Sequence, residues 1–195
     1  MLDLNPEYYV LYPEMAPNYP MLSSTLRPRS LGRMIVGDYT LKIQVSEPAP
    51  SAPEFVDYHT WGGDPVVSEK FVDALSALNI SGVQALAGNE GDVIVDFGLN
   101  YYLFHIYNLI ESLNFRKSNF QYDDEIEAVT ALESFELDSE KLSRIPLRDR
   151  MVFRMEEYPR LNIFHESIVD AVEQEGLKGM RFIPVKKWSD NSYFD

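Results

Sequence analysis

Few side chains in this sequence are of the types that catalyse reactions or hold metal ions, and they do not form a known catalytic motif. Only three histidines are present and cysteine is absent. His165-Glu166 begins like the zinc-binding pattern H-E-x-x-H, but Val169 occupies the position of the second histidine, so no zinc site is expected there. His165 and Ser167 could still act as a base and a nucleophile. The simpler interpretation is that His165 lies at the start of a helix.

Carboxylates are abundant, and two groups of them have spacings that invite a chemical interpretation. Asp92 and Asp96 flank a short apolar run, and glycosidases use two carboxyl groups that converge on one bond. Residues 123–127 contain four acids but lack the alternating ligand pattern of a calcium loop. We therefore expect no catalytic residue, no metal ion and no cofactor, and we expect that the protein is not an enzyme. A hydrolase with paired carboxylates is kept as an alternative.

Hydrophobic patterns indicate the elements that must position these side chains. Residues 101–113 fit either a strand, through their aromatic side chains, or one face of a helix, and both interpretations stay open. Residues 151–164 are expected to form a hairpin that turns at residues 157–160. Strands are predicted at residues 8–12, 34–45, 92–98, 126–137 and 151–155.

A segment of 19 residues occurs twice, at residues 68–86 and, 97 positions later, at residues 165–183. Five of the aligned pairs are identical, and others exchange one apolar residue for another. Each copy is predicted to form a strand, a helix that begins after Ser68 or His165, and a second strand. The predicted fold class is therefore α+β, with mostly antiparallel strands, few helices and two related strand-helix-strand units at about residues 65–86 and 161–185. The units can pack around a pseudo-twofold axis or form separate lobes.

Proline is concentrated at the start of the chain. Eight of the twelve prolines fall within residues 1–53, and the run SEPAPSAPE at residues 46–54 is the best candidate for a boundary. We expect a Pro-rich N-terminal segment with strands at residues 1–53 and an α+β domain at residues 54–195. One compact domain that includes both parts is also compatible with the sequence.

The net charge of −14 limits the partners that the chain can bind. A surface this acidic repels nucleic acid and anionic membranes and attracts basic proteins. No apolar run approaches the ~20 residues that span a bilayer, and the first residues lack the pattern of a signal peptide. Together with the absence of cysteine, this predicts a cytoplasmic protein that contacts neither nucleic acid nor a membrane.

Aromatic side chains within acidic stretches are the best candidates for contacts with a protein partner. Exposed aromatic residues often supply much of the binding energy of an interface. The alternative is that these rings lie in the core beneath a loop. The candidates are Glu54, Asp57, Tyr58, Trp61, Asp64, Asp123, Asp124, Glu125, Glu127, Glu156, Glu157 and Tyr158.

Three segments resemble, in order, the landmarks of one bacterial family. They are PVVSEKFVDALSALNISGVQAL, YYLFHIYNLIESLNFRKSNF and LNIFHESIVDAVEQEGLKGMRFIPV. The family comprises the immunity proteins of polymorphic toxin systems whose founding member is myxobacterial. The resemblance covers about residues 8–185 and is weakest before Pro65. It departs from the family pattern at Asn114, where an aspartate is usual, and at His165, where a serine is usual.

The resemblance implies a cytoplasmic protein that binds a cognate toxin and neutralises it by masking the toxin's active site. Such toxins are delivered between cells, for example by type VI secretion. A basic nuclease would suit an acidic inhibitor, because nucleases hold phosphate backbones. The immunity protein would be a monomer or a homodimer, and no cofactor is implied. A structural or adaptor protein of a phage or secretion system is a further alternative.

Overall fold

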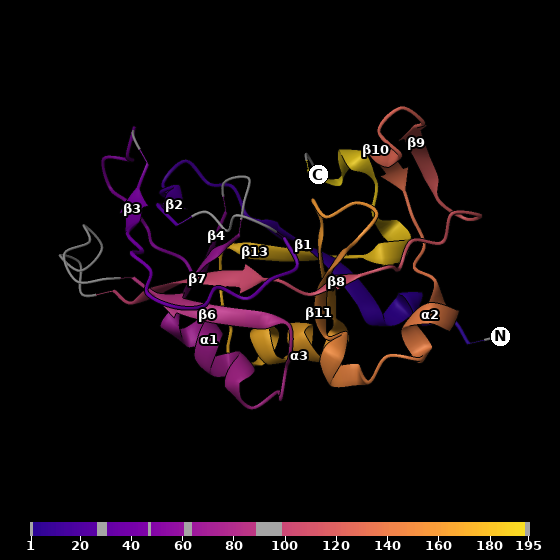
Figure 1. The fold of residues 1–195 in the computed structure, drawn as a ribbon. Coiled ribbons are helices and arrows are strands. Elements are labelled where there is room, and N and C mark those ends of the chain that lie inside the picture. Colours follow the sequence, from indigo (N-terminus) through magenta and orange to yellow (C-terminus); the bar gives the residue numbers. More distant parts are fainter. Residues whose placement is uncertain (1, 27–30, 47, 61–63, 89–98, 194–195) are drawn as a thin grey trace.

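The computed structural model describes residues 2–26, 31–46, 48–60, 64–88 and 99–193. It shows the expected α+β fold with mostly antiparallel strands (Figure 1). The helices of the described residues are α1 (Glu69–Ser76), α2 (Ser139–Ser143) and α3 (Glu166–Gln174), with short 3-10 turns η1 (Asn5–Glu7), η3 (Leu147–Asp149), η4 (Val185–Lys187) and η5 (Asp190–Tyr193). The strands are β1 (Tyr8–Pro13), β2 (Leu22–Ser24), β3 (Ile43–Val45), β4 (Tyr58–His59), β5 (Val66–Ser68), β6 (Val83–Ala87), β7 (Tyr101–Ile106), β8 (Leu109–Ile110), β9 (Asn119–Asp123), β10 (Ala128–Ser134), β11 (Val152–Met155), β12 (Asn162–His165) and β13 (Met180–Pro184).

The first copy of the repeat builds a four-stranded antiparallel sheet with the order β4-β5-β7-β6. The strands β4 and β5 pair with each other, α1 follows β5, and β6 returns on the far side of β7. The helix begins at Ser68, whose hydroxyl accepts a hydrogen bond from the Phe71 backbone N–H at 3.2 Å. The predicted strand-helix-strand unit is thus confirmed, and β7 lies between its two strands.

The second copy builds the same arrangement within a five-stranded sheet, in the order β13-β1-β12-β11-β8. The predicted hairpin is confirmed as β11 and β12, α3 follows β12, and β13 returns on the far side of β1. As expected, His165 begins the helix, where its ring accepts a hydrogen bond from the Ser167 backbone N–H at 3.2 Å. The strand β8 adds to β11 as a parallel edge strand.

The strands β1 and β7 occupy equivalent positions in the two sheets. Residues 8–10 pair with residues 165–163, and residues 101–103 pair with residues 68–66. The two registers are equivalent when the 97-residue offset of the repeat is extended to the strands that precede the helices. Pairing with β13 and with β6 keeps the same register. Both strands begin with Tyr-Tyr. We call β4, β5, α1, β6 and β7 the first unit, and β11, β12, α3, β13 and β1 the second unit. The start of the chain therefore completes the second unit.

The two units pack against each other through their helices. In Figure 1, α1 and α3 lie side by side beneath the strands, and they are in contact. Phe71 and Leu75 of α1 share one buried cluster with Ile168 and Val172 of α3. The loop that follows each helix is also hydrogen-bonded to the other unit. After α1, the N–H of Ser81 donates to the carbonyl of Arg148, which precedes β11, at 3.1 Å. After α3, the carbonyl of Lys178 accepts from the N–H of Asp57, which precedes β4, at 2.9 Å. Of the two arrangements left open, the structure has the pseudo-twofold packing.

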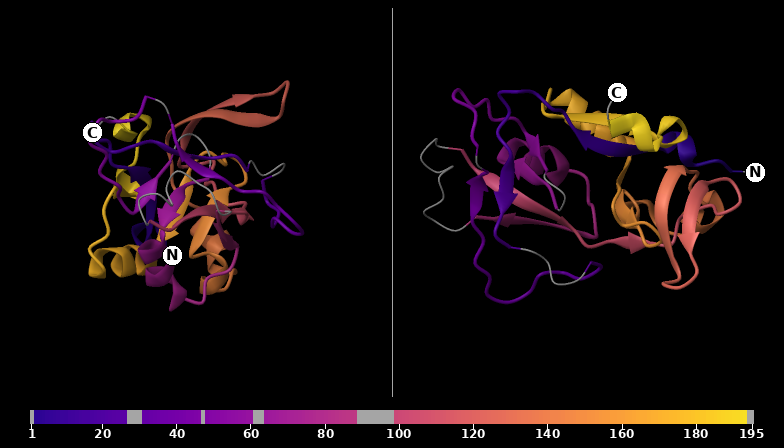
Figure 2. Two further views of the ribbon diagram at one scale, coloured as in Figure 1. Left: turned by 90° about the vertical axis from the view of Figure 1, so that its left-hand side faces the viewer. Right: turned by 90° about the horizontal axis from the view of Figure 1, so that it is seen from above.

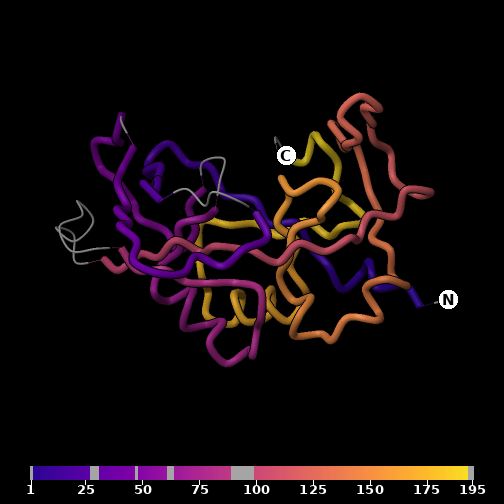
Figure 3. Tube along the Cα trace, viewed as in Figure 1, coloured from indigo at the N-terminus to yellow at the C-terminus, as the bar shows by residue number. Residues whose placement is uncertain are grey.

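The two sheets differ in what covers the face away from the helices. The hairpin β2–β3 covers the first sheet, where Leu22, Leu41 and Ile43 form a buried cluster. The second sheet is covered by the hairpin β9–β10, α2 and the C-terminal turns, through a cluster that includes Val129 and Trp188. The chain crosses between the sheets at residues 107–108, where β7 leaves the first sheet and continues as β8 of the second (Figure 3). The pseudo-symmetry therefore holds at the helices and ends at the outer faces.

Several strand predictions were corrected in length. Of residues 34–45, only Ile43–Val45 is strand, because the backbone of Ile35 bonds to the side-chain amide of Gln84 (2.8 and 3.1 Å) instead of a neighbouring strand. The strand predicted at residues 126–137 is shorter, because residues 123–127 form a turn. The strand predicted at residues 92–98 lies outside the described residues.

Two further elements could be assigned only from the structure. Residues 101–113, which fitted strand or helix, form β7 and β8. The break between them is fixed at Asn108, whose N–H donates to the Gly82 carbonyl at 3.1 Å and whose C=O accepts from the Arg154 N–H at 2.9 Å. The helix α2 was not predicted, because its five residues are too short to show a helical period.

Candidate partner-binding surface

The hairpin β9–β10 stands out from the body of the molecule (Figure 2). Its turn is held by the carboxylate of Asp123, which accepts hydrogen bonds from the N–H groups of Glu125 (2.9 Å) and Ile126 (3.4 Å). Glu127 has a φ of 51° and completes the turn. The sequence-predicted acids Asp124, Glu125 and Glu127 are therefore exposed at the tip of a projecting element.

The hairpin combines acidic and apolar surface. Residues 119–134 contain five acidic residues and no basic residue. The inward side is apolar and buried, with Val129 and Leu132 in the core cluster beneath it. On the outside, the side chains of Tyr122 and Ile126 are 49% and 65% exposed. Large apolar side chains that remain exposed among like charges are typical of a protein-binding surface.

An exposed aromatic side chain continues this surface at the base of the hairpin. Phe115 is 47% exposed and packs edge-to-face on Phe120, with ring centroids 5.4 Å apart. Phe115, Tyr122 and Ile126 were not among the residues predicted to contact a partner. The signal that could have found Tyr122 and Ile126 is the absence of any basic residue across residues 119–134, together with an apolar residue at the turn; Phe115 lies before this segment and gives no such signal.

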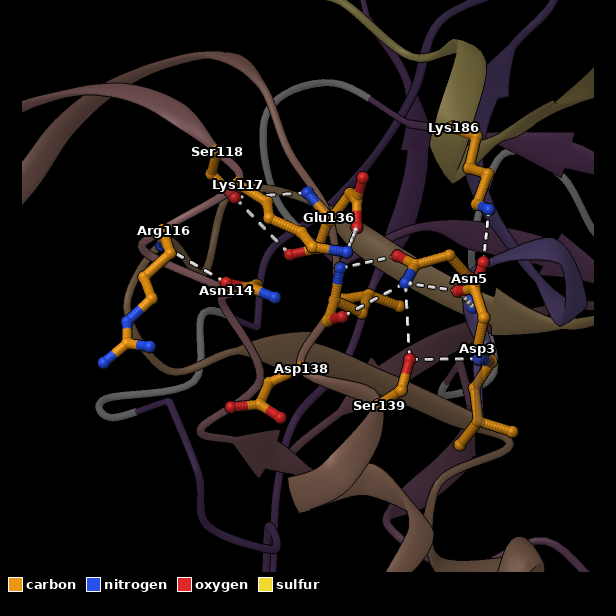
Figure 4. Close-up of polar contacts among 12 residues, drawn as sticks. Asp3, Asn5, Asn114, Arg116, Lys117, Ser118, Glu136, Asp138, Ser139 and Lys186 are labelled. Atoms are coloured by element: carbon orange, nitrogen blue, oxygen red, sulfur yellow. Dashed lines mark hydrogen bonds and ion pairs between the residues drawn. The ribbon is translucent and has the colours of Figure 1, made fainter. Parts of the chain in front are cut away.

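A groove of about 1,020 Å³ opens beside the base of the hairpin, between the N-terminal residues, the loop before β9 and α2 (Figure 4). Its charged groups are mostly paired: Lys117 bonds to Glu136 and Lys141 to Glu111, each at 3.0 Å. The guanidinium of Arg116 points away from the other residues drawn in Figure 4. The groove therefore offers a concave surface of low net charge beside an acidic convex one.

The wall of this groove is held by the buried side chain of Asn5. Its Oδ1 accepts a hydrogen bond from the Leu137 N–H at 2.6 Å, and its Nδ2 donates to the Leu137 carbonyl at 3.1 Å (Figure 4). The amide thus pairs with the backbone of Leu137 as a neighbouring strand would. Nearby, the hydrogen bond from Lys186, with a further one from Asn5, lowers the pKa of the Asp3 carboxyl to about 2. These contacts fix the N-terminal residues against the segment that leads into α2.

The sequence-predicted candidates between residues 54 and 64 differ in their exposure to solvent and in their contacts. Glu54 is exposed and accepts a hydrogen bond from the Asn18 side chain at 2.8 Å. Asp57 joins the two units, because its carboxylate accepts bonds from the Ser68 hydroxyl (2.7 Å) and the Lys178 N–H (2.9 Å). Tyr58 is buried. Trp61 lies outside the described residues.

Asp64 is buried in an ionic network rather than placed at a surface. Its carboxylate accepts bonds from His105 Nδ1 and from Arg154 Nη2, both at 2.7 Å, and its side chain is 3% exposed. His105 Nε2 lies 2.8 Å from the Arg33 carbonyl. Burial alone disfavours the charged ring, but the bonds to Asp64 and Arg33 outweigh it and raise the pKa of His105. Because both partners of the ring are acceptors, the geometry fits the doubly protonated, charged form.

The other two histidines also have structural surroundings. Burial lowers the pKa of His59 to about 4, so its ring is neutral at physiological pH. His165 Nδ1 lies 3.0 Å from the Ser167 hydroxyl and its Nε2 lies 3.3 Å from Glu7. The hydroxyl and the imidazole are thus adjacent, but Nδ1 also accepts the Ser167 N–H at the helix start. The equivalent position in the first unit, Ser68, performs the same capping with no imidazole.

The predicted candidates at the turn between β11 and β12 also differ in exposure. Glu156 is exposed. Glu157 accepts hydrogen bonds from the N–H groups of Ser112 (3.2 Å) and Leu113 (3.1 Å), so its carboxylate holds the chain after β8. Tyr158 packs partly buried against the core of the second sheet, with the Arg160 guanidinium 5.7 Å from its ring centroid. In the part of the chain that the structure describes, no three His, Asp or Glu side chains converge as metal ligands.

Comparison with known proteins gives the family. The model of an immunity protein family, Imm11, matches residues 38–187, which is most of the chain. The match includes the whole first unit and the second unit except β1. A search of the curated proteins found no match. Within the described residues, no helix has the length and apolar character needed to cross a bilayer. The chain therefore belongs to the Imm11 immunity protein family.

Proposed function

We propose that this chain binds a cognate bacterial toxin in the cytoplasm and neutralises it by covering the toxin's active site. Family membership supports an immunity role. The observation that carries the location is the projecting hairpin β9–β10, with five acids, no base and two exposed apolar side chains near its turn. Such a surface is complementary to a basic protein, and a nuclease that holds a phosphate backbone is basic.

The contact surface is proposed to include the exposed predicted acids Asp124, Glu125 and Glu127, together with Tyr122, Ile126 and Phe115. Apolar side chains at the centre of an interface supply most of its binding energy, whereas peripheral charges speed the encounter. The adjacent groove gives the toxin a concave surface beside the convex hairpin. Glu54 and Glu156, which are exposed elsewhere, are kept as secondary candidates.

The test is co-expression of this chain with the product of the adjacent toxin gene, with only one of the two tagged. A stable complex, with rescue of cells from the toxin, is the expected result. Absence of both would contradict the proposed function.

The location of the binding surface is tested by replacing Asp124, Glu125 and Glu127 with lysine in one variant. The association rate at low salt should fall by about tenfold or more, with a weaker dependence on salt. The matched control reverses Asp170, Glu173 and Glu175, which are exposed on or just after α3 and change the net charge equally. Equal effects of the two sets would show that only net charge matters and would remove the hairpin from the interface.

A further inference from the structure

The strand β6 forms one edge of the first sheet, and no described strand pairs with its outer side. The Gly82 carbonyl accepts the Tyr107 N–H at 3.0 Å, which marks this pair as hydrogen-bonded. Bonded and non-bonded pairs alternate in an antiparallel ladder. It follows that Val83, Ala85 and Ala87 direct their N–H and C=O groups outward. A row of unpaired backbone groups is a template for one more strand.

An apolar groove of about 310 Å³ runs beside this edge, between β6 and α1. Val72 and Leu75 of α1, Ile80 after it, and Phe104 of β7 line it together with Ala85. Ala85 is exposed, and its methyl group leaves room above the sheet. A strand added to β6 would therefore place every second side chain over this groove.

The second unit shows which side chains occupy the positions equivalent to Ala85 and Ala87 of β6. The repeat aligns Ala85 with Phe182, whose ring packs edge-on to Phe164 with centroids 6.2 Å apart. It aligns Ala87 with Pro184, which faces Tyr9 across the ladder as Ala87 faces Tyr102. Proline has no N–H to offer to a further strand. The second unit thus carries an aromatic ring and an edge residue without an N–H where the first unit carries two alanines, and no described strand pairs with the outer side of β6.

We propose that β6 and the groove beside it bind an extended segment of the toxin, which adds as a strand and inserts a large apolar or aromatic side chain at the place that Phe182 holds in the second unit. The proposal rests on the proposed function, because the toxin is the partner. The whole chain has a net charge of −14, so the segment is expected to be basic. A second copy of this chain is less suitable, because its own β6 presents only small side chains at the groove.

In Figure 1 the hairpin β9–β10 lies at the upper right, whereas β6 lies at the lower left and reaches the centre. In this arrangement an extended end of the toxin domain occupies β6 while the body of the toxin contacts the hairpin.

The first test is hydrogen exchange of the backbone amides, followed by NMR, for the chain alone and in the complex with the toxin. The N–H groups of Val83, Ala85 and Ala87 should exchange slowly only in the complex. Those of Gln84 and Leu86, which already face β7, should change little. This alternation is specific to strand addition, because a side-chain contact would not produce it.

The second test transfers the residues of the second unit to the first, as Ala85→Phe and Ala87→Pro. Each should lower the affinity for the toxin by about tenfold or more while the melting temperature shows that the chain is folded, because the fold accepts both residues in the second unit. Phe182→Ala is the matched control; it should lower the melting temperature and leave the affinity unchanged.

The outcomes separate the two proposals. A complex with unchanged exchange in β6 and unaltered affinity of both variants would overturn this inference and leave the immunity function standing. No complex at all would overturn both. Alternate β6 amides that exchange slowly in the chain alone, in a sample whose measured mass is that of a dimer, would show that a second copy of the chain occupies the edge. That result would overturn the proposal that a toxin segment binds there.

Discussion

At the scale of single residues, buried polar side chains tie the two units to each other. Asp64 precedes β5 of the first unit, His105 lies on β7, and Arg154 lies on β11 of the second unit. Burying an ion pair contributes little net stability, but removing one partner leaves the other charge in the interior without compensation. The network therefore fixes how the units fit together more than how strongly each folds.

We expect Asp64→Asn to lower the free energy of unfolding by about 3 to 5 kcal/mol, because Arg154 and His105 lose the charge that they share. The measurement is urea unfolding at neutral pH. The control is Glu140→Gln, which removes an exposed pair with Arg144 and should cost about 0.5 kcal/mol or less. A similar small loss for Asp64→Asn would mean that the interior network does not couple the units.

At the scale of elements, the turn after each repeat helix depends on a glycine that is pressed against the rest of the molecule. Gly82 and Gly179 are aligned by the repeat and have φ values of 80° and 90°. A Cβ at Gly82 would overlap the Asn108 side chain, and one at Gly179 would overlap Val56. Both turns therefore need glycine for the backbone conformation and for the close approach.

Gly82→Ala should lower the free energy of unfolding by about 3 kcal/mol, from the left-handed conformation and the overlap together. Gly176→Ala is the matched control, because Gly176 also has a positive φ of 62° but no atom within 4 Å of the added Cβ. That control should lose about 1 kcal/mol. If chemical denaturation gave equal losses for the two variants, the close approach to Asn108 would carry no energy.

At the scale of the whole molecule, the chain closes on itself through β1. This strand lies between β12 and β13, although more than 140 residues separate it from either in sequence. Its Tyr8 and Val10 are fully buried. The family match begins at residue 38, after β1, yet the second unit has no contiguous sheet in its absence.

A chain that lacks residues 1–13 should lose cooperative unfolding, because β12 and β13 would both become unpaired edges. Circular dichroism during thermal unfolding measures this. A synthetic peptide of residues 1–14, added in trans, should restore the transition, and a scrambled peptide should not. A truncated chain that unfolds cooperatively alone would show that β1 is dispensable.

Local patterns were sufficient for much of the fold. The repeat, its capped helices, the hairpin at residues 151–164 and the α+β class could all be predicted, because helix starts and strand alternation depend on neighbours a few residues apart. Lengths were less predictable: Leu41 keeps the alternating burial of a strand, but β3 begins only at Ile43, since the pairing partner β2 is short. The exposed acids at residues 124–127 were recognised by composition, whereas the exposure of Ile126 required the turn.

The sequence by itself determined the family resemblance, the duplicated strand-helix-strand unit and the net charge of −14 on which the proposal of a basic partner rests. Only the tertiary structure decided that β1 and β7 fill equivalent places, that the side chains of Tyr58 and Asp64 are interior, and that β6 has no described strand on its outer side, beside an apolar groove. The physical reason is the sequence separation of the contacts involved. Helix caps and alternation are fixed by contacts within a few residues, whereas strand order, burial and the partner of a buried charge depend on segments far apart in the chain.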